Sequence, residues 1–97
     1  MTIYLKKFGT LLNGRMVGGE AFAAFLPSLS DLKDNEKIKV DFEGVDVFSP
    51  SWGDEFLSSL IKKFGDKVVL ENTQNPAVKT TLDFLEEINR TKFNREN

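Results

Sequence analysis

The chain has 97 residues, 40% of them hydrophobic, and this size and composition suit one domain with a modest core. Its 13 basic and 15 acidic residues give a net charge of -2 and are scattered, so composition gives no support for strong nucleic-acid binding. The sequence has no Cys and no His, which excludes disulfides, thiolate chemistry, the common catalytic triads and the usual zinc sites. We therefore expect no enzyme activity, no catalytic residue, no metal and no cofactor.

The apolar segments are too short for a membrane protein. The longest uninterrupted run, Ala21 to Leu26, cannot span a bilayer, and the first ten residues lack the apolar core of a signal peptide. We expect a soluble cytoplasmic protein without a membrane partner.

The first third of the chain predicts strands and a helix. Residues 2–8 place apolar side chains around two lysines, which suits an opening strand. Asn13-Gly14 is a strong turn signal and is expected to join a second short strand that reaches Val17. The Ala- and Phe-rich segment 20–26 favours a helix, which Pro27 should break or kink.

The segment Lys37 to Gly65 predicts a strand, a tight turn and a helix. Residues 37–42 alternate charged and apolar side chains, so one face of this strand should be covered and the other relatively open. From Ser49 a helix-start signature precedes apolar residues at helical spacing, and Gly65 closes the helix.

The last third predicts one more strand and one more helix. Residues 67–71 form a short apolar run typical of an inner strand. Asn75 is a good N-cap and Pro76 a good first residue for a helix that should end near Arg90. Residues 91–97 are polar apart from one Phe and are expected to fray.

The alternation of strands and helices predicts a single α/β domain over residues 1–97. The right-handed crossover rule makes the strands around Ile38 and Val68 parallel neighbours. Because Lys39 and Asp41 put charges on the former strand, we expect a small mixed or mostly parallel sheet with helices mainly on one face.

Ligands and partners of open α/β sheets tend to meet the loops at the carboxyl ends of the strands. Three loops qualify, at residues 13–19, 49–54 and 72–75. If Ser49 is the N-cap with Pro50 next, the hydroxyl of Ser51 is free near the positive end of the helix. Ser51 is then a candidate phosphate acceptor, although Asp54 and Glu55 would oppose the added charge. In the alternatives, Ser51 caps the helix with Asp54 as the capping acid, or both serines are only structural.

Other side chains of these loops have two interpretations each. Trp52 is either a core residue or an aromatic anchor for a protein partner. Arg15 and Asn72 are candidates for an anion or ligand loop, and for Arg15 the alternative is solvent or a carboxylate partner. The spacing of the acidic residues matches no calcium loop, so they are interpreted as solvated surface.

The run IKVDFEGVDVFSPSWGDEF, from Ile38 to Phe56, resembles the signature of a bacterial STAS-like domain family of unknown function. That family is distantly related to the anti-sigma factor antagonists. Its members show an apolar strand ending in Asp, then Gly-Val, then Ser-Pro-Ser and an acidic-aromatic helix start. Gly14-Arg15 and Asn72 extend the likeness over most of the chain, which implies one STAS-like domain.

In the antagonists the same turn reads Asp-Ser-Ser-Gly, and a partner ATPase kinase that is also the anti-sigma factor phosphorylates its second serine. Ser51 takes the position of that serine, whereas the Asp and the Gly are replaced by Ser49 and Trp52. The resemblance implies a protein-interaction module of a bacterial signalling or regulatory system, with a histidine-kinase-like ATPase as partner and Ser51 as its switch. Its expected docking residues are Ser49, Pro50, Trp52 and Asp54. The alternative function is a small-molecule or nucleotide binding domain that uses the loops at the carboxyl edge of the sheet.

Overall fold

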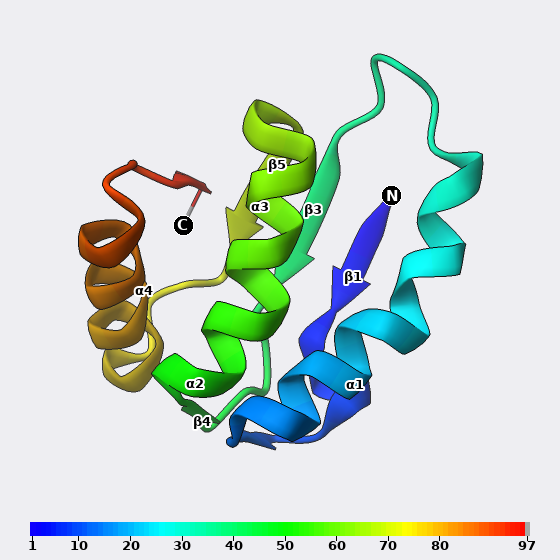
Figure 1. Ribbon diagram of the computed structural model, residues 1–97. Coiled ribbons are helices and arrows are strands. Elements are labelled where there is room, and N and C mark those ends of the chain that lie inside the picture. The colour runs from blue at the N-terminus through cyan, green and yellow to red at the C-terminus, as the bar shows by residue number, and fades with distance from the viewer. Residues whose placement is uncertain (97) are drawn as a thin grey trace.

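Four short strands form the centre of the computed structural model, which describes residues 1–96 (Figure 1). They are β1 (Thr2–Tyr4), β3 (Ile38–Asp41), β5 (Val68–Glu71) and β6 (Asn94–Glu96), in the spatial order β1-β3-β5-β6. All neighbouring strands of this sheet are parallel. The predicted α/β class and the parallel pairing of the Ile38 and Val68 strands are therefore confirmed.

A helical segment connects each strand of this sheet to the next. Helix α1 (Arg15–Phe25) lies between β1 and β3, and α4 (Pro76–Asn89) lies between β5 and β6. Between β3 and β5, α2 (Pro50–Gly53), a π-helical turn (Asp54–Ser58) and α3 (Ser59–Phe64) follow one another without interruption and form the central helix.

The helices cover only one face of the sheet, as expected from the charged strand. The chain always moves the same way across the sheet, and right-handed crossovers then place every helix on the same side. Figure 1 shows α3 in front of β3 and β5, with α1 on one side and α4 on the other. The uncovered face carries mostly polar side chains, in two rows set by the strand register: Thr2, Lys39, Val69, Asn94 and Tyr4, Asp41, Glu71, Glu96.

A second, two-stranded sheet lies at the carboxyl end of the main sheet. It pairs β2 (Leu11–Leu12) with β4 (Val47–Phe48) in parallel, so it joins the segment before α1 to the segment before α2. Short 3-10 turns occupy three connections: Leu5–Phe8, Leu26–Asp31 and Gly65–Lys67. Within the described residues, every helix is too short or too polar to serve as a membrane span.

The start of the chain differs from the sequence expectation. The opening strand ends at Tyr4 rather than Phe8, and the expected second strand to Val17 does not form, because α1 already begins at Arg15. Gly18 and Gly19 therefore lie inside a helix. Glycine has a low helix propensity, so the sequence predicts that the helix starts after the two glycines. Tertiary packing of α1 overrides this propensity.

The expected break at Pro27 is confirmed, since α1 ends at Phe25 and a 3-10 turn follows. The expected fraying of residues 91–97 is wrong for residues 94–96, because they form β6 against β5. Asn97 lies outside the described residues. Side chains of α4 form hydrogen bonds and ion pairs with residues 93–95. These are tertiary contacts, so the local sequence of residues 91–97 does not show them.

Candidate functional site

The turn between β4 and α2 is built by local capping. The Ser49 Oγ accepts a hydrogen bond from the backbone N–H of Trp52 at 3.2 Å, and Pro50 occupies the first helical position. The Ser49 N–H in turn donates to the Leu12 carbonyl at 2.8 Å, which ties the turn to β2. Ser49 is thus the N-cap, and the alternative in which Ser51 caps the helix is wrong.

Ser51 is left at the edge of this turn. Its side chain is partly exposed, next to the exposed Pro50, and its Oγ lies 3.2 Å from the Ser49 Oγ. This single contact joins two hydroxyls, so the Ser51 hydroxyl has spare hydrogen-bonding capacity near the start of the central helix.

The Trp52 indole lies in the core. It is fully buried and stacks on Phe56, with ring centroids 4.9 Å apart and 15° between the planes. The expectation that Trp52 is a docking anchor is therefore wrong, because a partner cannot reach a buried side chain. Its backbone also packs closely on Gly18, where an added Cβ would lie 2.7 Å from the Trp52 carbonyl oxygen.

Arg15 joins the start of α1 to the π-helical turn. Its Nη1 lies 3.0 Å from the Asp54 Oδ2 and 3.2 Å from the Glu55 Oε1. The hydrogen bonds to Asp54 and then Glu55 raise the pKa of Arg15 above its ordinary value. Arg15 therefore has carboxylate partners, which is one of the two alternatives that the sequence left open. One of these partners is Asp54, an expected docking residue.

Asn72 has a different environment at the end of β5. It adopts a left-handed backbone conformation (φ 56°), and its Nδ2 donates to the Asp41 Oδ1 at 2.8 Å. The Glu43 N–H donates to the same oxygen at 2.9 Å, so these bonds fix the carboxyl ends of β3 and β5. Within residues 1–96, Arg15 and Asn72 share no hydrogen bond, and the two candidates for an anion or ligand loop lie in different environments, Arg15 beside two carboxylates and Asn72 beside Asp41.

A shallow pocket of about 370 Å³ lies beside Asn72 at this carboxyl edge. Its lining includes Glu43 and Asp46 and contains neither Lys nor Arg. Such a lining repels phosphates and carboxylates, so this pocket does not favour a nucleotide. In the part of the chain that the structure describes, acidic side chains do not gather into a group that could hold a metal ion.

Four exposed apolar side chains lie on segments that contact the turn, namely β2, β4 and the start of α1, and the sequence expectations missed them. We call them the turn patch: Leu11, Met16, Val17 and Val47. Leu11 and Val47 are direct partners in the small sheet, and both face outward because Leu12 and Phe48 face the core. The sequence signal that would have found them is a helix start at Arg15, which puts Met16 and Val17 on its first turn.

The comparisons with known proteins agree with this architecture. No curated protein and no solved structure matches the chain significantly. The model of a family described as a STAS-like domain of unknown function matches residues 24–77, which is more than half of the chain and includes the whole turn. The chain therefore belongs to this family of STAS-like domains of unknown function.

Proposed function

We propose that the protein is a non-enzymatic interaction module of a bacterial signalling or regulatory system. It docks a protein partner through the turn patch and the exposed part of the turn at Pro50 and Ser51. Phosphorylation of Ser51 by a histidine-kinase-like ATPase partner switches this docking. The observation that carries the proposal is that exposed apolar side chains lie on the segments that pack against the turn of Ser51, whose side chain is partly exposed.

The turn patch supports docking because it concentrates exposed apolar surface. Half of the large hydrophobic side chains that are exposed belong to it, and Met16 and Leu11 are 78% and 67% exposed. Contiguous apolar surface with a polar rim is typical of protein-interaction sites. The polar groups at the turn itself are Ser49, Ser51 and the ion pairs that Arg15 forms with Asp54 and Glu55.

The charges near Ser51 support a switch. A phosphate would add about -1.5 to -2 charges beside the turn patch, which disfavours burial of that surface under a partner. Asp54 and Glu55 oppose such a phosphate less than expected, because Arg15 already neutralises part of their charge. The phosphate would compete for Arg15, since arginine forms strong charge-assisted hydrogen bonds to phosphate oxygens.

The switch is tested by incubating the protein with a candidate histidine-kinase-like ATPase and ATP, followed by mass spectrometry. We expect one phosphate, located on Ser51 and absent from Ser51→Ala. A kinase that is active on its own but leaves Ser51 unmodified would overturn the switch, and docking would then be judged by the next experiment.

Docking is tested with two lysine substitutions at apolar side chains of similar exposure. Val47→Lys lies in the turn patch, and Phe84→Lys lies on the outer face of α4. We expect Val47→Lys to weaken binding of the ATPase about tenfold or more by calorimetry, and Phe84→Lys to have little effect. Equal effects of the two substitutions, or no binding by the unmodified protein, would contradict docking through the turn patch.

A further inference from the structure

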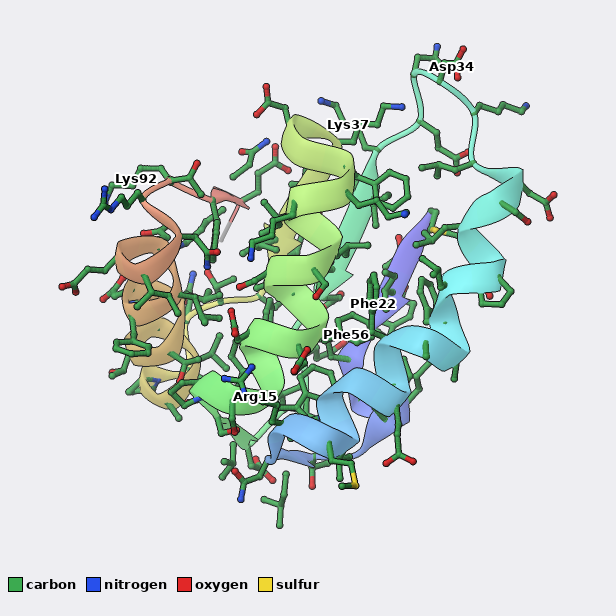
Figure 2. All side chains as sticks on the ribbon, viewed as in Figure 1. Arg15, Phe22, Asp34, Lys37, Phe56 and Lys92 are labelled. Carbon is green, nitrogen blue, oxygen red and sulfur yellow. The ribbon has the colours of Figure 1, made fainter. Side chains whose placement is uncertain are left out.

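A larger pocket lies at the other end of the molecule, away from the turn patch. It has a volume of about 420 Å³ and is bordered by α3, the end of α4 and the segment that leads into β6. In Figure 2, Lys37 and Lys92 mark this end of the molecule and Arg15 marks the opposite end. The volume is within the range of about 300–1,000 Å³ that is usual for small-molecule sites.

The deep part of the pocket is apolar with one polar pair. Val68 and Phe93 are buried, and Ile61 is partly buried beside them. Ser58 is also buried, and the Asn89 Nδ2 donates to its Oγ at 2.9 Å. A ligand would thus meet an apolar surface for a ring or short chain and a fixed polar pair at its side.

The rim of the pocket is basic. Lys37, Lys62 and Lys92 line it together with a single carboxylate, Asp66, although the protein as a whole has a net charge of -2. Within residues 1–96, neither Lys37 nor Lys62 has an ion-pair partner. Lys92 lies 3.7 Å from the Glu86 Oε1, with its side chain 92% exposed, so this contact holds it weakly.

We propose that this pocket binds a small organic anion. Its apolar body lies against Ile61, Val68 and Phe93, and its carboxylate or phosphate group is held by Lys37 and Lys62 at the rim. Unpaired cations around an apolar recess attract this class of ligand, because the field of the lysines raises its local concentration and burial of its body removes apolar area from water. The site is independent of docking at the turn patch.

The test uses two amphipathic anions, naphthoate and naphthyl phosphate, and the neutral analogue naphthalenemethanol. Each is titrated into isotope-labelled protein and followed by amide NMR shifts. We expect saturable shifts at Lys62, Asn89 and Phe93 with at least one anion, and binding about tenfold weaker or more for the neutral analogue. The tighter anion identifies the charged group as carboxylate or phosphate. The absence of saturable shifts at these amides, or equal binding of the neutral analogue, would overturn the proposal.

Charge variants separate this site from general attraction of anions to the surface. Lys62→Gln should weaken anion binding about two- to fivefold, and Asp66→Asn should strengthen it by a similar factor. Lys79→Gln is the matched control, since Lys79 is an exposed lysine outside the lining, in the first half of α4. Unchanged affinity in Lys62→Gln, or an equal loss in Lys79→Gln, would contradict the proposed role of the rim.

Discussion

The two sides of the central helix are packed by different chemistry. Toward α1, Phe56 contacts a cluster of aromatic rings, with centroid distances of 5.8 Å to Phe22 and 6.3 Å to Phe25. Toward α4, Ser58 forms a hydrogen bond to Asn89 and borders the larger pocket. Packed aromatic rings fill the space between the helix and α1, whereas the polar side leaves a recess.

This difference arises within three residues of the π-helical turn. Phe56, Leu57 and Ser58 are consecutive and all buried, which requires a helix enclosed on most of its circumference. The sheet and the two neighbouring helices provide that enclosure (Figure 2 labels Phe56 and Phe22 at the contact with α1). The aromatic side thus stabilises the turn with the candidate switch, and the polar side shapes the candidate ligand site.

On the aromatic side, a substitution at Phe56 should cost the most stability. Phe56→Ala should reduce the free energy of unfolding by about 3–5 kcal/mol, because it removes a fully buried ring from a cluster that also contains Trp52. Phe84→Ala is the control, since Phe84 is 47% exposed, and it should cost less than about 1 kcal/mol. Urea unfolding measures both. If Phe56→Ala does not fold, Phe56→Leu, which retains much of the buried area, should still show a larger loss than Phe84→Ala.

A substitution at Glu86 should cost less stability than the one at Phe56, and it removes polar contacts between α4 and the end of the chain. The buried Glu86 accepts a hydrogen bond from the Phe93 N–H at 2.8 Å and lies 3.0 Å from the Arg95 Nη2. Burial alone lowers the pKa of Arg95, but hydrogen bonds to Asp83 and Glu86 raise it above its ordinary value. Glu86→Ala leaves these donors without that partner and should cost about 1–3 kcal/mol.

Amide hydrogen exchange shows which part of the chain loses stability in Glu86→Ala. In Glu86→Ala, the amides of β6 should exchange faster while those of β3 keep most of their protection. Glu87→Ala changes an exposed neighbour and should alter stability by less than about 0.5 kcal/mol. Unchanged exchange in β6 would show that other contacts hold this strand.

A pair of glycine substitutions tests the close packing on the aromatic side. Gly18→Ala should destabilise by about 1–3 kcal/mol, because its Cβ would lie 2.7 Å from the Trp52 carbonyl oxygen and the backbone must shift. Gly19→Ala has open space at the same helix and should stabilise by about 0.5–1 kcal/mol. Opposite signs in thermal unfolding support the close approach of α1 to the turn. Equal signs would contradict it.

Local signals were sufficient for much of the fold. The N-caps Ser49 and Asn75 each bond a backbone N–H two or three residues ahead, and the strands around Ile38 and Val68 follow from their apolar pattern and the crossover rule. These features depend on neighbours in sequence or on general topology, so they could be predicted.

The errors concern residues whose partners are distant in sequence. Gly18 lies in a helix that packs on Trp52, and residues 94–96 pair with β5 while Arg95 forms ion pairs with Glu86 and Asp83. The turn patch and the basic pocket were missed for the same reason. Each brings together side chains from separate elements, and local patterns show at most one part of it, such as the first turn of α1 with Met16 and Val17.

The two serines of the turn should differ modestly in what they contribute to the free energy of unfolding. Ser49→Ala should cost about 1 kcal/mol, because it removes the acceptor for the Trp52 N–H, whereas Ser51→Ala should change stability by less than about 0.5 kcal/mol. Urea unfolding of both variants at one temperature measures the difference. A cost in Ser51→Ala as large as that in Ser49→Ala would show that the pair of hydroxyls caps the helix together, and modification of Ser51 would then also loosen the turn. With the expected result, the Ser51 side chain contributes little to stability. A phosphate on Ser51 would then change the charge of the docking surface without unfolding the protein.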